Sequence, residues 1–469
     1  MKNSRPFNHQ LKSLKHAETT PFVYDCSDPG TGKTAVAIWA AEKRIKQKQV
    51  RKVLVLAPKS LLRSVWFSDF KKFAPALKVV VSTAGKHEAV FAEDAQIYVT
   101  NIDAVKWLAK QPKKFFKDFD ELIIDESSAY KHGTAQRSKA AAKIAGYFKF
   151  RRAMTGTPNS NTITDVWHQV KILDGGNRLG GSFFAFRNAV CTPEQRGNHE
   201  KAIEWVDKDG AEEVVFGMIS DIVIRHKFED CVDIPDNHRY SINYDLSPKQ
   251  MLAYEAMEQQ AIAEIYGEGA YELAKLKGER PKPLTHVTAI NAAAVRTKLL
   301  QIASGAVYES PDNYHVVDTT RYEMVLDMIE AREHSLTFFL WKHQRDLLIA
   351  EAEKRGIKYA LIDGTVKESH RDAIVKRYQA GQLQTIFAHP KSAGHGLTLT
   401  RGTATIWASP TDDLEIFEQG SKRQHRIGQS KKTETISVLA SGTVEDKVYN
   451  NMLTKGKRMS NLLDLFSTL

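Results

Sequence analysis

The alternation of apolar and polar stretches along the chain predicts two successive α/β lobes. Short apolar runs rich in β-branched residues recur, and each is followed by a segment with helical periodicity. In the first half these runs are PFVYDC, KVLVLA, QIYVT, ELIIDE and RRAMTG, and in the second half LTFFLW, KYALID, QTIFAH, ATIWAS and ETISVLA. Apolar strands of this length, separated by helices, are typical of parallel sheets that are covered on both faces. We therefore expect one parallel sheet in each half of the chain.

The region between the two halves has a different pattern. From roughly residue 192 to residue 217 it is polar and poor in strand signals, and from Pro248 to about Lys277 it predicts one long helix that the segment GERPKP ends. A second helical stretch is expected from about Val287 to Ala303. The predicted organisation is an N-terminal lobe over 1–230, an interlobe segment with a helical insertion over 231–320, and a C-terminal lobe over 321–469.

Length and composition agree with two folded domains and add a weak indication of the partner. The 469 residues are 42% hydrophobic and 26% charged, and 67 basic against 56 acidic side chains give a net charge of +11. Such a balance favours an anionic partner such as nucleic acid, although many soluble proteins are mildly basic. No run approaches the roughly 18 apolar residues of a membrane span, and the N-terminus lacks a signal-peptide core. Three widely spaced cysteines exclude a disulfide framework and a CxxC zinc site, so we expect a cytosolic enzyme.

A phosphate-binding loop is predicted directly after the first strand. The segment SDPGTGKT contains the glycines, lysine and threonine of a G-x-G-K-T motif, which are Gly30, Thr31, Gly32, Lys33 and Thr34. Glycines allow backbone N–H groups to approach a pyrophosphate, and the N-terminus of the following helix attracts its charge. The lysine would reach the β- and γ-phosphates and Thr34 would bind Mg²⁺. The strict motif has another glycine where this chain has Ser27; a glycine turn with a chance lysine is the alternative.

An acidic pair follows another predicted strand, in ELIIDESSAYK. The carboxyl end of a buried parallel strand is where such sheets place their ligands. Asp125 would hold Mg²⁺ through water, and Glu126 would orient or deprotonate the attacking water. The alternative is a pair of solvated charges that cap the next helix. Together, the loop and the pair predict hydrolysis of a nucleoside triphosphate.

The second half contributes arginines instead of a second phosphate loop. Arg423 and Arg426 lie three positions apart on a predicted helical turn, in FEQGSKRQHRIGQSKK. Guanidinium groups are permanently charged and suit the charge on a transferring phosphoryl group. Carried on the second lobe, they would complete a site that is built on the first lobe when the lobes close. A basic surface helix is the alternative.

This arginine segment resembles the sixth motif of helicase superfamily two, in the form found in its Swi/Snf-type DNA translocases. Its pattern, Q-x-x-x-R-x-x-R-I-G-Q, is matched from Gln419 to Gln429. Other segments that resemble the motifs of this family occur in the expected order, namely FNHQ, LVLAPKSLLRSVWFSDFKKF, MTGTPNSN, the interlobe segment from Ile222 to Tyr254, ALIDGTVKESHRDAIVKRY, SAGHGLTLT and GTVEDKVYNNM. The resemblance implies an α/β fold of two tandem RecA-like lobes with a helical insertion between or upon them.

The resemblance also implies the ligands and their contacts. ATP and Mg²⁺ would be held by the phosphate loop and Asp125, with Gln10 recognising adenine, and Glu126, Gln419, Arg423 and Arg426 would act in catalysis. Duplex DNA would be held by its phosphates without sequence specificity. The expected DNA contacts are Lys59, Ser60, Thr100, Ser392, Gly394, Gly396 and Thr398. We expect a compact DNA-dependent ATPase of a bacterium or phage that translocates on duplex DNA in the cytoplasm, without a membrane partner.

Two other functions remain open at this point. A strand-separating DNA or RNA helicase would share the ATP site, although no separation wedge is evident. An ATP-gated clamp that binds DNA with weak turnover is favoured by Ser128, which stands where the family usually has a histidine. The tryptophans lie in helical or strand patterns and are expected in the core rather than in contact with bases.

Overall fold

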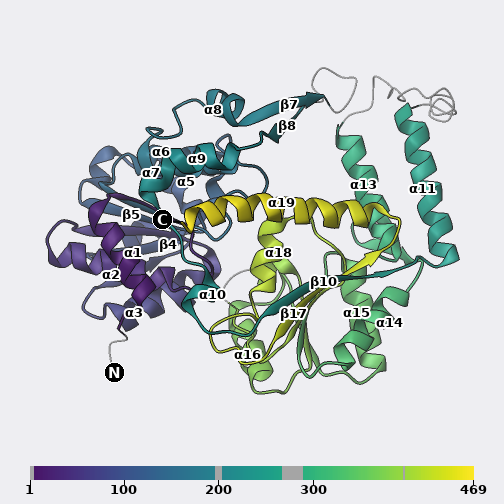
Figure 1. Ribbon diagram of the computed structural model, residues 1–469. Coiled ribbons are helices and arrows are strands. Elements are labelled where there is room, and N and C mark those ends of the chain that lie inside the picture. The colour runs from purple at the N-terminus through teal and green to yellow at the C-terminus, as the bar shows by residue number, and fades with distance from the viewer. Residues whose placement is uncertain (1–4, 196–202, 267–288, 394–396, 469) are drawn as a thin grey trace. The chain divides into compact units, whose positions relative to one another are not determined.

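The computed structural model describes residues 5–195, 203–266, 289–393 and 397–468 (Figure 1). These residues form two compact units. Unit 1 comprises residues 1–192, 207–233 and 455–469, and unit 2 comprises residues 193–206 and 234–454. These divisions differ from the three predicted stretches, because the last fifteen residues belong to unit 1 rather than to a C-terminal lobe. The C-terminal helix α19 (Val444–Phe466) therefore contributes residues to both units.

Unit 1 contains a seven-stranded parallel sheet in the order β3-β4-β2-β5-β6-β1-β9. Five of its strands coincide with the predicted runs, namely β1 (Phe22–Asp25), β2 (Lys52–Ala57), β4 (Ile97–Asn101), β5 (Phe119–Asp125) and β6 (Phe150–Met154). Two edge strands were not predicted, β3 (Val79–Ser82) and β9 (Val223–Ile224). Because all the strands are parallel, their carboxyl ends lie at one edge of the sheet, and the polar side chains that follow them gather there.

Unit 2 contains a six-stranded parallel sheet in the order β10-β17-β16-β13-β15-β14. All five predicted runs of the second half form strands, namely β13 (Ser335–Phe338), β14 (Tyr359–Ile362), β15 (Thr385–Ala388), β16 (Ala404–Trp407) and β17 (Thr433–Ala440). The edge strand β10 (Asn237–Tyr244) was not predicted, because its NHRYSINY sequence is largely polar and half-exposed. The predicted fold class, two α/β lobes with parallel sheets, is confirmed.

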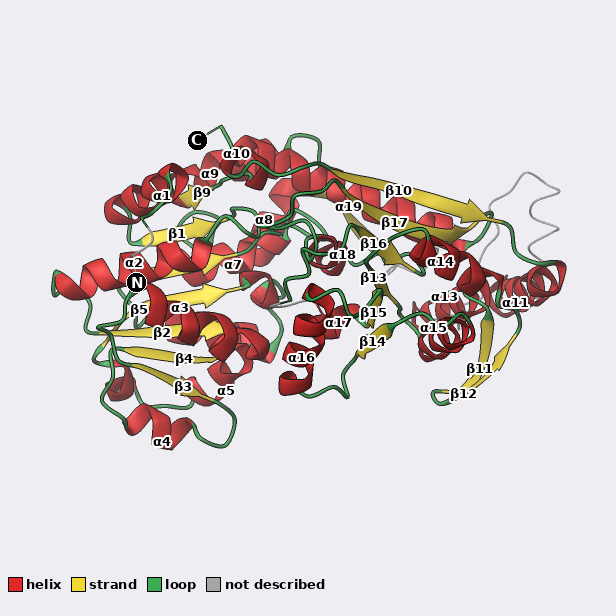
Figure 2. Cartoon of the chain, turned by 90° about the horizontal axis from the view of Figure 1, so that it is seen from below, coloured by secondary structure: helices red, strands yellow, loops and turns green. Residues whose placement is uncertain are grey.

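Helices cover both sheets, as Figure 2 shows. Those of unit 1 are α1 (Asn8–Thr19), α2 (Lys33–Lys46), α3 (Ser68–Phe73), α4 (His87–Ala92), α5 (Val105–Leu108), α6 (Gln136–Ala145), α7 (Asp165–Asp174), α8 (Phe183–Val190), α9 (Ala211–Ile219) and α10 (Phe228–Cys231). Those of unit 2 are α11 (Pro248–Tyr266), α13 (Ala289–Ala303), α14 (Thr320–Glu330), α15 (Lys342–Lys354), α16 (Glu368–Gln379), α17 (Pro390–Ala393) and α18 (Leu414–Ser421). Among the residues described, no helix has the length and apolar character needed to cross a membrane.

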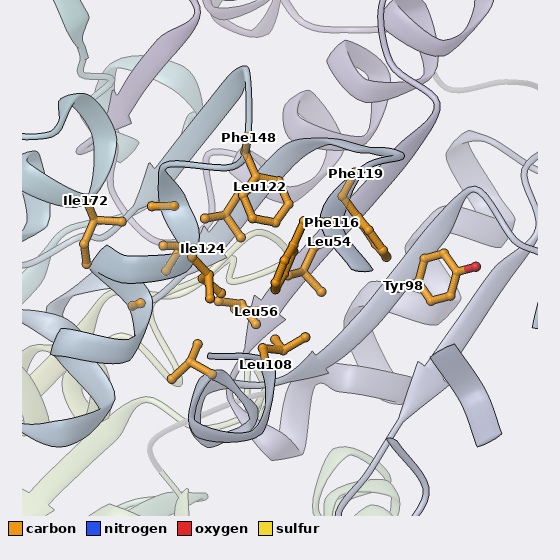
Figure 3. Packing of buried hydrophobic residues seen from close by; sticks show 14 of the residues in the cluster. Leu54, Leu56, Tyr98, Leu108, Phe116, Phe119, Leu122, Ile124, Phe148 and Ile172 are labelled. Atoms are coloured by element: carbon orange, nitrogen blue, oxygen red, sulfur yellow. The ribbon is translucent and has the colours of Figure 1, made fainter. Parts of the chain in front are cut away.

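The core of unit 1 is divided by its sheet into two apolar layers. Alternate residues of β2 point to opposite faces: Leu54 and Leu56 belong to a cluster with residues of α5 and α6, whereas Val53 and Val55 belong to a cluster with α2 and α3. Figure 3 shows the first cluster, in which Leu54, Leu56, Leu122 and Ile124 lie among the rings of Phe116, Phe119 and Phe148. A sheet that is buried on both faces fixes the strand ends on which the candidate site is built.

The middle region corrects one prediction. Residues 192–217 were expected to lack strands, but β7 (Cys191–Gln195) and β8 (Ile203–Asp207) form a two-stranded sheet of their own, followed by α9. Their side chains are mostly exposed and polar, so no apolar run marks these strands in the sequence. The predicted helices occur as α11 and α13, and the remainder of the first, 267–277, lies outside the described residues. Both helices pack against the end of β17 through Leu246, Tyr254, Leu299, Ile302 and Ala440.

Candidate functional site

The predicted phosphate loop connects β1 to α2 and takes up a conformation that requires glycine at two positions. Gly30 and Gly32 have φ angles of +95° and +83°, in the left-handed region that other residues rarely adopt. A Cβ atom at Gly32 would lie 2.3 Å from Gln10 Nε2, and one at Gly30 would lie 2.8 Å from the ring of Phe228. Gly30 is therefore required both by its backbone and by the Phe228 ring, whereas Gly32 is required by its backbone, and a Cβ there would displace the Gln10 amide.

The absent third glycine of the motif has a local explanation. Ser27 is not in the left-handed region, so its position does not require glycine. It is buried, and its hydroxyl accepts a hydrogen bond from His226 N at 3.1 Å. Its own N–H donates to the carboxylate of Asp25 at 3.2 Å. The serine thus adds one side-chain hydrogen bond, from His226 N, to the backbone bond that any residue at this position could make.

Residues distant in sequence hold the loop from behind. The guanidinium of Arg225 donates to Asp28 Oδ1 at 2.9 Å and to the carbonyl of Cys26 at 2.8 Å. The side chains of His9 and Gln10 both donate to the carbonyl of Thr31, at 2.8 and 3.2 Å. Gln10 also accepts a hydrogen bond from the N–H of Phe7, the residue that precedes helix α1. The predicted adenine-recognising glutamine therefore lies directly against the phosphate loop.

The lysine and threonine of the motif lie in the first turn of α2, where backbone N–H groups have no partner within the helix. Lys33 Nζ donates to the carbonyl of Ser27 at 2.5 Å, so the ammonium group folds back over the loop. Thr34 is half-buried beside it. The loop, the helix N-terminus and the ammonium group together form a site suited to a polyphosphate anion.

The acidic pair lies at the carboxyl end of β5. Asp125 is buried, and its Oδ2 accepts a hydrogen bond from the indole N–H of Trp66 at 2.8 Å. Burial raises the pKa of Asp125 above its ordinary value, while the Trp66 hydrogen bond and the charge of Lys33 act in the opposite direction. Glu126 is half-buried and has φ 55° and ψ 60°, a left-handed conformation that costs a non-glycine residue about 1–3 kcal/mol. Strain of this kind gathers at active sites.

Hydrogen bonds join the acidic pair to the TGTP segment. The hydroxyl of Ser127 donates to Gln169 Oε1 at 2.7 Å, and Gln169 Nε2 donates to the carbonyl of Pro158 at 2.8 Å. A Cβ atom at Gly156 would lie 3.0 Å from Pro29 of the phosphate loop, so the two segments are in close contact. Ser128, where the resemblance led us to expect a histidine, is buried in the short helix Ser127–Tyr130.

These residues fit ATP with Mg²⁺. Two glycines leave room where any side chain would collide, and a lysine and a helix N-terminus supply positive charge near the end of β1. One carboxylate oxygen of Asp125 accepts a hydrogen bond from Trp66, and the positive charge of Lys33 opposes the rise that burial causes in the pKa of this carboxyl group. Hydroxyl and carboxylate oxygens are the ligands that Mg²⁺ prefers, and Thr34 and Asp125 would supply them.

In unit 2 the predicted arginines lie in a turn and not in a helix. Helix α18 ends at Ser421, so Arg423 and Arg426 follow it, and the prediction of a helical turn is wrong. Gly428, with φ +98°, reverses the chain shortly afterwards. Arg426 Nη1 donates to the carbonyl of Leu397 at 3.0 Å and to the hydroxyl of Thr398 at 3.3 Å. Arg423 is buried and approaches the same carbonyl at 3.5 Å.

Amide side chains hold this arginine turn, which we define as residues 422–429. Gln429 Nε2 donates to the carbonyls of Thr400 and Gly402 at 3.0 and 2.9 Å. Gln424 Nε2 donates to the hydroxyl of Tyr378 at 3.2 Å. Predicted catalytic Gln419 is buried on α18, the helix that precedes the turn.

The expected DNA contacts have different surroundings. Lys59 is exposed and Ser60 is half-buried, at the start of the helical segment that follows β2. Thr100 has no exposed surface, and its hydroxyl donates to the carbonyl of Ser82 at 3.1 Å. The unpredicted strand β3 covers this edge of β4, so Thr100 does not offer its side chain to DNA in this structure.

The remaining expected DNA contacts belong to unit 2. Ser392 is half-buried on α17, and Thr398 is exposed beside Arg426. Gly394 and Gly396 lie outside the described residues.

Sequence reasoning did not find the residues that support the site. Trp66 was assigned to the core, and it is fully buried, but its N–H is also directed at Asp125. Arg225 was noted only as part of the interlobe segment, and Gln169 was not noted. An apolar or amide residue within a helical pattern carries no local signal of a partner that is far away in the chain, and only the position of Trp66 within a motif could have indicated it.

The model of the SNF2-related domain matches residues 26–285, and the model of the helicase conserved C-terminal domain matches residues 320–428. Protein p41 of Acyrthosiphon pisum secondary endosymbiont phage 1 is 27% identical over 98% of this chain and 98% of its own length. An uncharacterized ATP-dependent helicase of Mycoplasma genitalium is 25% identical over 89% of this chain, which spans 38% of that protein.

Among solved structures, the SWI2/SNF2 ATPase core of Sulfolobus solfataricus in complex with double-stranded DNA aligns with 99% of this chain and 95% of its own, at 20% identity and a TM-score of 0.45.

Proposed function

Since the chain belongs to the SNF2-related family and is an ATP hydrolase, we propose that it hydrolyses ATP when bound to duplex DNA and uses the energy to move along the duplex. The observation that carries this proposal is the pairing, in one chain, of a built phosphate loop with an acidic pair and a separate arginine turn. A metabolic kinase would not require the second lobe.

Each residue of the candidate site has a proposed role in hydrolysis. Lys33 and the loop N–H groups bind the phosphates, and Gln10 contacts adenine. Glu126 orients the attacking water and accepts its proton, and Arg423 and Arg426 stabilise the charge that develops on the transferring phosphoryl group. Gln419 positions the arginine turn. Closure of the lobes would bring the arginines to the bound nucleotide and couple hydrolysis to movement.

Thr34 and Asp125 are the proposed residues that hold Mg²⁺, Asp125 through water. When bound, the ion supplies positive charge to the phosphate oxygens. Trp66 occupies the other side of the Asp125 carboxylate and fixes its orientation.

DNA would be bound through its phosphates, since basic side chains exceed acidic ones by eleven. Lys59 and Ser60 in unit 1, and Ser392, Gly394, Gly396 and Thr398 in unit 2, are the proposed contacts. Contacts of this kind are independent of sequence and weaken with salt. The helicase relative and the phage relative are consistent with a nucleic-acid motor that acts in a bacterial or phage-infected cell.

The test is the ATPase rate with duplex DNA, single-stranded DNA, branched DNA and RNA, over a salt series. We expect duplex DNA to stimulate hydrolysis most, with a stimulation that falls as salt rises. Lys33→Ala, Glu126→Gln and Arg426→Ala should each abolish the stimulated rate. Full stimulated activity in any of these variants would contradict the proposed function.

Two further assays separate translocation from its alternatives. Displacement of a third strand from a triplex, without unwinding of a forked duplex, is the result expected of a translocase. Unwinding of the fork would instead indicate a strand-separating helicase. Tight ATP-dependent binding of DNA without stimulated phosphate release would indicate a clamp.

A further inference from the structure

The segment that follows β2 is one continuous helical stretch with an unusual interior. It begins as a 3₁₀ turn at Lys59–Leu61, continues as a π-helix at Leu62–Phe67 and ends as the α-helix α3. Isolated π turns are rare and are frequent at functional sites. A π turn holds one residue more than the α turn it replaces. Conversion of the π turn to an α turn would shift the helix on one side of the turn relative to the other by one residue. That shift is about 1.5 Å along the helix axis and about 100° around it.

The buried side of this π-helix reaches the acidic pair. Trp66 has no exposed surface, lies in the apolar cluster between the sheet and α2, and packs beside Phe70. Its indole N–H donates to Asp125 Oδ2 at 2.8 Å. A one-residue change of register in the π turn would carry the indole away from the carboxylate.

The outer side of the same segment carries exposed polar and basic groups. Lys59, Arg63 and Ser64 are exposed, and the hydroxyl of Ser64 donates to the carbonyl of Ser60 at 2.6 Å, across the junction of the 3₁₀ and π turns. Lys59 and Ser60 are the proposed phosphate contacts. A phosphate held there would tie down the first turn of the segment, and the π turn is the next element along the chain.

We propose that Trp66 is a positioning residue and that the segment Lys59–Phe67 transmits DNA contact to the ATP site. Duplex DNA at Lys59 and Ser60 stabilises the π form and thereby keeps the indole N–H on Asp125. The carboxylate is then fixed in one orientation. Without DNA the π turn exchanges with other helical forms, and the carboxylate is held for a smaller part of the time. This inference rests on the proposed function and deepens it.

The test compares Trp66→Phe, which keeps a ring in the core but removes the N–H, with a matched control. Trp167 is also buried, on α7, and donates its N–H to the carbonyl of Gly180 at 3.0 Å, so Trp167→Phe loses a similar ring and a similar hydrogen bond elsewhere in unit 1. For each variant, the affinity for a random-sequence duplex is measured by fluorescence anisotropy, nucleotide affinity by calorimetry, and kcat with and without duplex.

In Trp66→Phe we expect a fall of about tenfold to hundredfold in the ratio of stimulated to basal kcat at saturating duplex, the factor that a hydrogen bond to a charged group supports, and a duplex affinity no higher than that of the wild type, because duplex binding and the π form are linked. Trp167→Phe should keep the wild-type ratio. In the wild type, duplex DNA should slow amide hydrogen exchange of residues 62–67, and this measurement does not depend on whether the variant folds.

A Trp66→Phe variant with the wild-type ratio would overturn the inference, as would exchange of residues 62–67 that duplex leaves unchanged. An equal fall of basal and stimulated kcat would also overturn it, since Trp66 would then act on hydrolysis without transmitting DNA contact. If no duplex stimulates the wild type, the proposed function fails first and the inference fails with it.

Discussion

The phosphate loop of unit 1 and the arginine turn of unit 2 are held in different ways. Contacts from far along the chain hold the loop: Arg225 reaches Asp28 and Cys26 across about two hundred residues. Most contacts of the arginine turn span fewer than about fifty residues, from Arg426 to Leu397 and from Gln429 to Thr400, and one is long, from His425 to the carbonyl of Pro235. The loop is fixed by the folding of the whole unit, whereas the turn depends mainly on its own neighbourhood.

This difference predicts how each site responds to change. A loop that is fixed from several sides should bind its ligand in a preformed state, and damage to it should appear in nucleotide affinity. Damage to a turn that presents guanidinium groups should leave nucleotide affinity intact and slow the chemical step. The following predictions separate these two behaviours.

The largest effect is expected from Arg426→Ala in the arginine turn. A guanidinium that stabilises the transferring phosphoryl group contributes on the order of 10³–10⁵ in kcat, so stimulated hydrolysis should fall by at least about 10³-fold. Nucleotide affinity should stay near the wild-type value, because the phosphate loop is unchanged. Single-turnover kinetics and a fluorescent-nucleotide titration measure the two quantities. Lys432→Ala, which removes an exposed cation just beyond the turn, is the control and should keep full activity.

The two units should lose stability alike as the pH falls, despite their different sites. Each contains a buried histidine, His168 in unit 1 and His343 in unit 2, and burial lowers the pKa of both from 6.5 to about 4. Between these values the unfolded chain binds a proton that the folded chain does not, so the stability is present above pH 6.5 and is lost as the pH falls toward 4.

A shift of this size corresponds to at most about 3 kcal/mol for each histidine. Urea unfolding followed by hydrogen exchange in each unit should show this slope between pH 7 and pH 4. His168→Gln should flatten it in unit 1 only, and His343→Gln in unit 2 only. If neither substitution changed the pH dependence of stability, its attribution to these two histidines would be wrong.

A smaller effect is expected from Gly32→Ala in the phosphate loop. The alanine must adopt a left-handed backbone, and its Cβ must displace the Gln10 side chain from Thr31. Nucleotide affinity should therefore fall by about tenfold, or about 1.4 kcal/mol. Gly85→Ala is a matched control, since its φ is +79° but nothing lies within 4 Å of the new Cβ. It should lower the stability of unit 1 by about 1 kcal/mol without changing nucleotide affinity.

The smallest effect is expected from Ser27→Gly, which restores the strict motif. The hydroxyl that accepts from His226 N is lost, so the free energy of unfolding should fall by about 1 kcal/mol. Nucleotide affinity should not rise, because Ser27 has no need of a left-handed backbone. Tighter nucleotide binding by this variant would show that the loop is less fixed than its contacts indicate.

The two parallel sheets and the residue types of the site could be predicted from the amino-acid sequence. Ten apolar runs became strands because continuous β-branched stretches are stable only when both faces of a sheet are covered. The phosphate loop and the acidic pair were found because their chemistry requires adjacent residues, which a local motif records. The strands β7 and β10 were missed because their sequences are largely polar, and β8 was missed because its apolar residues Ile203, Trp205 and Val206 are too few to form a continuous run.

The residues that hold the site became identifiable once the fold was known. Trp66 resembles other core tryptophans in the sequence, and its bond to Asp125 exists because β2 and β5 are neighbours in the sheet. Thr100 follows the rule for a residue near a strand end, yet the unpredicted β3 buries it. Hydrogen bonds act over about 3 Å in space regardless of separation along the chain, so these partners become visible only once the strands have been placed side by side.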